Sequence, residues 1–123
     1  LIDDTYNANP ASLDVAIQCL APRTGKRIIV LGDMAELGSH SRDLHSAAGD
    51  MIRLAGIDHL LTIGDMAKNA SDAFGLGASH FHSHDAVIDA ARSLLGRDVT
   101  CLVKGSRSAE MDNVADALTE TGS

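Results

Sequence analysis

The chain has 123 residues, of which 45% are hydrophobic, and its formal net charge is -7. This length and composition predict one domain, residues 1–123, with a buried core, and exclude a disordered segment. A negative charge without a basic stripe interleaved with aromatic side chains argues against nucleic acid as a partner. The sequence has no continuous apolar stretch of membrane length and no signal peptide, so we expect no membrane insertion.

Short apolar runs alternate along the chain with segments of helical periodicity. We expect strands at residues 1–2, 27–31, 59–63, 80–82 and 99–103, and helices at residues 13–20, 44–55, 66–74, 87–95 and 111–118. This alternation predicts a three-layer α/β fold with a mostly parallel, Rossmann-like doubly wound sheet. In such sheets ligands bind outside the carboxyl ends of the strands, and the polar segments of this chain follow its predicted strands.

The core of this fold has to be built almost without aromatic residues, which make up 2% of the chain. We expect Val, Ile, Leu, Met and Ala to fill it. The two cysteines, Cys19 and Cys101, are far apart in the sequence and lack the spacing of metal ligands. We interpret them as two buried thiols rather than as a disulfide.

The first polar segment, Asp3 to Pro10, contains two adjacent carboxylates, a tyrosine and two asparagines directly after a short apolar start. Asp and Asn suit turns and helix caps, and Pro10 suits the first turn of a helix. A simple turn into a helix needs one such residue rather than five. The surplus predicts a ligand at the end of the first strand, with Asn9 or Ser12 as the cap of the following helix.

Two further polar segments follow predicted strands. Gly32 to Gly38 places the carboxylates of Asp33 and Glu36 at the ligand edge, although a solvated turn would look the same. Lys104 to Ser108 combines two cations, a glycine and two hydroxyls just before a helix. Backbone amides at a helix start add positive potential, so this segment suits a carboxylate or a phosphate. The alternative is a helix cap with exposed charges.

The histidines leave several interpretations open. His80, His82 and His84 alternate, so in a strand all three imidazoles would face one way, as in a metal site. Against a metal, the neighbouring Ser83 and Asp85 resemble helix caps and no further ligand stands at suitable spacing. His45 opens a helix beside the 32–38 loop, where it either faces the cleft or caps the helix.

No phosphate-binding P-loop is present. Thr24-Gly25-Lys26 has Leu20 where the first glycine belongs, and Arg27 stands in place of Ser or Thr. This segment also precedes its strand instead of following it. No Gly-x-Gly-x-x-Gly motif follows a strand either, so we do not expect this chain to hold a triphosphate or a dinucleotide by itself.

Three segments together resemble the C-terminal domain of the Mur ligase family, in particular of its MurF type. They are Asp3 to Ser12, Leu31 to Gly38 and Leu102 to Arg107, and they match in order, spacing and α/β context. The resemblance covers essentially the whole chain. The run 108–110 departs from the glycine and methionine of the family.

The resemblance implies an ATP-dependent ligase that adds D-alanyl-D-alanine to the UDP-N-acetylmuramoyl-tripeptide of peptidoglycan synthesis through an acyl phosphate. This chain would be its C-terminal domain, a fragment of a longer bacterial cytoplasmic enzyme. The absent N-terminal and central domains would bind the UDP end and carry the P-loop. ATP and Mg²⁺ would be held mainly by the central domain, so the isolated chain is expected to be inactive. The alternative is a stand-alone, non-catalytic module that binds a nucleotide or a partner.

The first motif resembles the family segment that touches the nucleotide. By this match Asp4 would accept hydrogen bonds from the ribose hydroxyls, because two carboxylate oxygens suit a vicinal diol. Tyr6, Asn7 and Asn9 would line the adenosine side or order the turn. The resemblance does not separate their roles.

The other two motifs would meet the incoming dipeptide. Lys104, Ser106 and Arg107 are the residues implied at the reaction centre, with Arg107 or Lys104 as the partner of the dipeptide carboxylate. Asp33 and Glu36 would orient that cluster or meet the dipeptide ammonium group.

Overall fold

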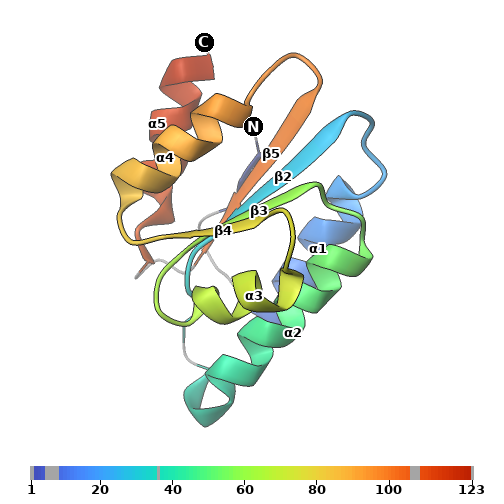
Figure 1. The fold of residues 1–123 in the computed structure, drawn as a ribbon, viewed down its shortest axis with the longest axis vertical. Coiled ribbons are helices and arrows are strands. Elements are labelled where there is room, and N and C mark those ends of the chain that lie inside the picture. Colours follow the sequence, from blue (N-terminus) through green and yellow to red (C-terminus); the bar gives the residue numbers. More distant parts are fainter. Residues whose placement is uncertain (1, 5–8, 36, 106–108, 123) are drawn as a thin grey trace.

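The structure, a computed structural model, describes residues 2–4, 9–35, 37–105 and 109–122, of which 2–4 and 119–122 are described by their backbone alone. Its centre is a five-stranded sheet in the order β1-β5-β2-β3-β4, and every neighbouring pair of strands is parallel (Figure 1). The strands are β1 (Ile2–Asp4), β2 (Lys26–Leu31), β3 (His59–Ile63), β4 (Ala78–Phe81) and β5 (Val99–Lys104).

Helices cover both faces of the sheet, which gives three layers (Figure 1). One face carries α1 (Pro10–Leu20), α2 (Ser41–Leu54) and α3 (Ala67–Phe74), and a short 3₁₀ helix, η1 (Gly38–His40), precedes α2. The other face carries α4 (His84–Leu94) and α5 (Met111–Gly122). The doubly wound α/β fold expected from the alternation of apolar patterns is therefore confirmed.

The central strand β2 shows why the sheet is buried on both sides. Ile29 and Leu31 pack against the α1–α3 layer, whereas Ile28 and Val30 pack against α4 and α5. All four side chains are fully buried. A continuous apolar run, rather than an alternating one, is what a strand covered on both faces requires.

Element boundaries follow local capping. Asn9 caps α1: its side-chain oxygen accepts the Ser12 N–H at 2.9 Å, and the Asn9 N–H donates to the Ser12 hydroxyl at 3.1 Å. The two residues considered as alternative caps therefore act together as a capping box. The fourth strand is the clearest shift in boundary, because it begins at Ala78 and ends at Phe81 instead of spanning 80–82.

The prediction for the cysteines is half wrong. Cys101 is buried in β5, and burial raises the pKa of its thiol to about 11. Cys19 is exposed, although it was expected to be buried. It lies on α1 between the buried positions Ile17 and Leu20, on a part of the helix that faces away from the sheet.

The order of the strands predicts two crevices at the carboxyl edge of the sheet. The connections after β1, β2 and β3 lead into the α1–α3 layer, whereas those after β4 and β5 lead to the opposite face. Neighbouring strands whose connections diverge in this way leave a crevice at their carboxyl ends. One crevice therefore surrounds the end of β5, and the second lies between β3 and β4.

Helices α2 and α3 approach each other closely at Gly49. A Cβ atom added at Gly49 would lie 2.1 Å from the carbonyl oxygen of Ala70 in α3, a contact that rigid backbone cannot relieve. We therefore predict that Gly49→Ala lowers the free energy of unfolding by about 1–3 kcal/mol, as overpacking does. In a helix without this contact, the same change would raise stability by about 1 kcal/mol.

Gly96→Ala is the matched control, because the nearest atom to an added Cβ there is 3.8 Å away. Urea unfolding of both variants gives the comparison. A Gly49→Ala protein as stable as the wild type would contradict the close helix contact.

Candidate functional site

The first crevice is built around Lys104, the last residue of β5. Lys104 is fully buried, its carbonyl accepts the Gly32 N–H at 2.8 Å, and its register partner in β1 is Asp4. A buried ammonium group is costly unless charged or polar groups compensate for lost water. The sheet therefore holds a cation at the ligand edge, at the position where β1, β2 and β5 end together.

The loops after β2 and β5 meet over Met111, the first residue of α5. A Cβ atom at Gly32 would come within 2.6 Å of the Met111 Cγ, and one at Gly105 within 2.4 Å. The Cβ at Gly105 would also lie 3.4 Å from the Gly32 Cα. The two glycines thus bring two loops onto one fully buried side chain.

His45 holds the loop after β2 in place. Its imidazole is fully buried, and Nε2 accepts the backbone N–H of Met34 at 2.9 Å. Because Nε2 accepts, the proton of the neutral ring lies on Nδ1, which donates to the Ser41 carbonyl at 2.7 Å. His45 thus links the loop to the first turns of α2, and with its ring fully buried it neither faces the cleft nor caps the helix.

Asp33 joins the same loop to α3. Its Oδ1 accepts the Ala67 N–H, the first of the helix, at 2.7 Å. The carboxylate packs against Gly64, where an added Cβ would lie 2.4 Å from Oδ1. A carboxylate at a helix N-terminus is favourable because it satisfies a free N–H and opposes the helix dipole.

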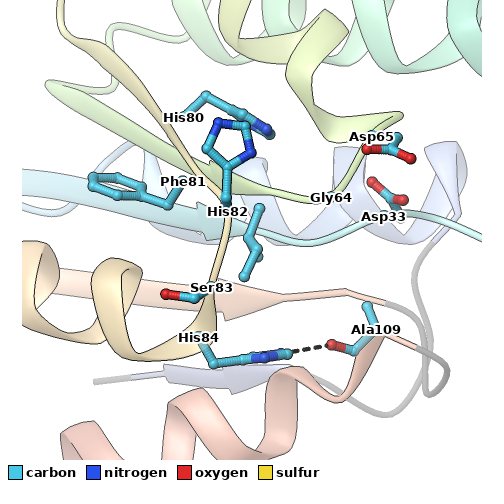
Figure 2. A pocket seen from close by; sticks show the side chains of 10 residues that line it. Asp33, Gly64, Asp65, His80, Phe81, His82, Ser83, His84 and Ala109 are labelled. Atoms are coloured by element: carbon cyan, nitrogen blue, oxygen red, sulfur yellow. Dashed lines mark hydrogen bonds between the residues drawn. The ribbon is translucent and has the colours of Figure 1, made fainter.

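The second crevice contains a cavity of about 330 Å³ between the ends of β3 and β4. Asp33 and Asp65 lie toward one side of it, and the rings of His80 and His82 lie toward the other (Figure 2). The remaining lining comes from the end of β3, the start of α4 and the segment before α5, namely from Ile63, Gly64, Phe81, Ser83, His84 and Ala109.

His80 is the most constrained side chain of this cavity. Its Nδ1 is 2.7 Å from the hydroxyl oxygen of Thr62, its register partner in β3. Its ring meets that of His82 edge to face, with centroids 5.2 Å apart. Partial burial, then the neighbouring His82 and Lys68, lower the pKa of His80, although Asp33 and Asp72 oppose the shift.

His80, His82 and His84 do not share one strand, and Ser83 caps α4, as its place in the sequence indicated. The strand ends at Phe81, so its alternation does not extend to the start of α4. His84 instead hydrogen-bonds through Nε2 to the Ala109 carbonyl at 3.0 Å (Figure 2). Among the described residues, no group of three or more His, Cys, Asp or Glu side chains is placed to hold a metal ion.

Several predicted site residues lie outside the described part of the chain. These are Tyr6, Asn7, Glu36, Ser106 and Arg107. Asp4 is placed by its backbone at the end of β1. Asn9 is described, and its side-chain oxygen caps α1, so it orders the turn as one of its two suggested roles requires.

The cavity between β3 and β4 was missed as a site. Asp65 follows β3 much as Asp33 follows β2, and the histidine pattern indicates His80 only as a metal candidate. The rule that ligands bind at the carboxyl ends of parallel strands could have indicated this site, if it had been applied to β3 and β4 together. It required knowing that β3 and β4 are adjacent and that their connections diverge.

The sequence model described as Mur ligase, glutamate ligase domain, matches residues 1–107 of this chain. The chain belongs to this family. It is 44% identical over 124 residues to the UDP-N-acetylmuramoyl-tripeptide--D-alanyl-D-alanine ligase of Escherichia coli, with 99% of this chain and 27% of that relative covered. The corresponding ligase of Haemophilus influenzae is 36% identical, with 96% and 27% covered. The chain therefore spans about a quarter of the length of these relatives.

Solved structures agree with this assignment. MurF from Acinetobacter baumannii superposes with a TM-score of 0.82 at 30% identity, covering 94% of this chain and 27% of that one. MurF from Thermotoga maritima, solved in complex with ADP, has a TM-score of 0.83 at 21% identity over the same shares, a likeness of fold alone. Within the described residues, no helix is both long and apolar enough to span a membrane.

We predict that His45→Phe lowers the free energy of unfolding by about 1–3 kcal/mol, because the Met34 N–H is left buried without an acceptor. His45→Gln should recover part of this loss, since its amide oxygen can take the place of Nε2. Urea unfolding measures both, and hydrogen exchange at the Met34 amide reports the bond directly.

His40→Phe is the control, because His40 is exposed and makes no side-chain cap. Equal losses for His45→Phe and His45→Gln would show that ring volume, rather than the Met34 bond, determines stability here.

Proposed function

We propose that this chain is the C-terminal domain of an ATP-dependent ligase that adds D-alanyl-D-alanine to UDP-N-acetylmuramoyl-tripeptide in bacterial peptidoglycan synthesis. The observation that carries the proposal is the 44% identity to the Escherichia coli ligase across 99% of this chain. A likeness that covers only the fold would leave the substrate open, since one fold hosts many functions.

The proposed reaction divides between this domain and the rest of the enzyme. ATP phosphorylates the terminal carboxylate of the tripeptide, and the dipeptide amine then attacks the acyl phosphate to give the amide, ADP and phosphate. We assign the phosphates of ATP to another domain, because this sequence contains no P-loop. Closure of this domain over the site would exclude water, which otherwise hydrolyses the acyl phosphate.

The fit of the nucleotide to this chain rests on the crevice around β5. The buried cation of Lys104 and the backbone of Asp4 meet there, at the edge where the first motif leaves the sheet. We propose that Asp4 binds the ribose and that Tyr6 and Asn7 line the adenosine side or order the turn, whereas Asn9 orders the turn by capping α1. Magnesium neutralises phosphate charge in such reactions, and we assign it to another domain, because the described residues include no cluster of ligands.

We propose that the dipeptide lies between the same crevice and Asp33. Arg107 or Lys104 pairs with its carboxylate, and Ser106 adds a hydroxyl donor. Asp33, with Glu36, meets its ammonium group. Asp33 can do so while capping α3, because only its Oδ1 is committed to the Ala67 N–H. The enzyme acts in the cytoplasm of a bacterium by this proposal.

The direct test is a ligation assay with the full-length enzyme, following phosphate release. We expect phosphate release with UDP-N-acetylmuramoyl-tripeptide and D-alanyl-D-alanine, and little with single amino acids. The isolated 123-residue chain should release no phosphate from ATP. Preference for a single amino acid would replace the proposed substrate, and inactivity of the whole enzyme would favour a non-catalytic module.

We predict that Arg107→Ala in the full-length enzyme raises the KM for D-alanyl-D-alanine at least about tenfold, the loss expected when a charged hydrogen bond of 1.5–3 kcal/mol is removed. The KM for ATP should stay within a factor of about two. Arg97→Ala is the matched control, because Arg97 is exposed and precedes β5, at the opposite edge of the sheet. A rise confined to the KM for ATP would place Arg107 on the nucleotide instead.

A further inference from the structure

The cavity between β3 and β4 has no role in the function proposed above, apart from the carboxylate of Asp33 that it shares. It holds two carboxylates and two imidazoles within about 330 Å³, at a place where parallel sheets bind ligands. His80 is the group in it with the most defined environment, since both a hydrogen bond and a stacked ring hold it.

The Thr62 hydroxyl hydrogen-bonds Nδ1 of His80, so Nε2 is the nitrogen left for a ligand. With the proton on Nδ1, His80 donates to the Thr62 oxygen at 2.7 Å, and Nε2 carries the free lone pair. In Figure 2 the ring extends from β4 toward the side of the cavity where Asp33 and Asp65 lie. Thr62 is itself fully buried, so the anchor of the ring is rigid.

The surroundings of His80 act on its charge state in opposite directions. Partial burial, His82 and Lys68 of α3 lower its pKa from 6.5, so the neutral base predominates at pH 7. Asp33 and Asp72 act in the opposite direction and would stabilise the imidazolium after proton transfer. These groups come from the loop after β2, from α3 and from the end of β4.

The reaction needs such a base. The amino group of a dipeptide has a pKa of about 8, so at pH 7 it is mostly ammonium and has no lone pair for attack. A carboxylate such as Asp33 binds the ammonium form and thereby opposes its deprotonation. A neutral base in the same cavity as that carboxylate gives the ammonium proton an acceptor.

We propose that His80 is the proton acceptor that converts the ammonium group of the incoming dipeptide into the attacking amine. This inference rests on the proposed function. One N–H proton moves to Nε2 of His80, and the nitrogen lone pair then forms the C–N bond to the acyl phosphate carbon. As the C–O bond to phosphate breaks, the second N–H proton leaves with the phosphate. The imidazolium returns its proton to solvent before the next turnover.

The test is the pH dependence of kcat/KM for D-alanyl-D-alanine in the full-length enzyme. In the wild type we expect activity to rise through a pKa below 6.5, that of His80. His80→Gln should lower kcat/KM at pH 7 by roughly 100-fold, the usual contribution of a general base. Its activity should then rise through a pKa of about 8, that of the free amine, and largely recover at pH 9.

Two controls separate this role from a structural one. His82→Gln removes the neighbouring imidazole, which is exposed, and should keep the low-pH limb. Hydroxylamine, an amine that is already neutral at pH 7, should trap the acyl phosphate equally well in the wild type and in His80→Gln. The proposal would be overturned if the activity of the wild type rose only through a pKa of about 8. It would also be overturned if His80→Gln lowered the rate equally with D-alanyl-D-alanine and with hydroxylamine at every pH. If the wild type forms no hydroxamate at all, the proposed function fails instead.

Discussion

The insertion of the last strand between the first two is the constraint on which this structure depends. β5 pairs with β1 on one side and with β2 on the other, so no continuous sheet exists until residues 99–104 are in place. Pairings between segments this far apart in sequence form slowly, because a large loop has to be closed first. The same pairings bring the first and last polar segments of the chain to a single edge.

As a consequence, the carboxyl edge of the sheet brings distant parts of the chain together at two separate places. Around β5, the buried Lys104 stands beside the register position of Asp4. Between β3 and β4, two imidazoles stand opposite two carboxylates. Asp33 connects the two places, because it follows the central strand and yet caps α3 beside the second crevice. A substrate with one charged group at each end could contact both.

Much of the fold could be predicted from the sequence, because the information was local. The run 28–31 is apolar at every position, and only a strand covered on both faces requires that. Asn9 and Ser12 indicated the start of α1, because their capping hydrogen bonds lie within one helical turn. The motifs after β1, β2 and β5 likewise predicted the ligand edge, since they are short and contiguous.

What could not be predicted depends on which segments become neighbours. The partner of the His45 ring is the Met34 N–H, eleven positions earlier, and the partner of Asp33 is the start of α3, thirty-four positions later. The exposure of Cys19 depends on which side of α1 meets the sheet. The apolar residues Ile17 and Leu20 on either side of it did not show whether Cys19 itself lies on that side. His84 lies apart from His82 because β4 ends at Phe81. Residue propensities locate the end of a strand only to within a few residues.

Met111 determines how closely the loops after β2 and β5 can approach each other. Its unbranched thioether fills the gap below Gly32 and Gly105, and such a side chain adapts to irregular spaces without strain. A methyl group gained at either glycine would therefore require a smaller side chain at position 111, at the start of α5.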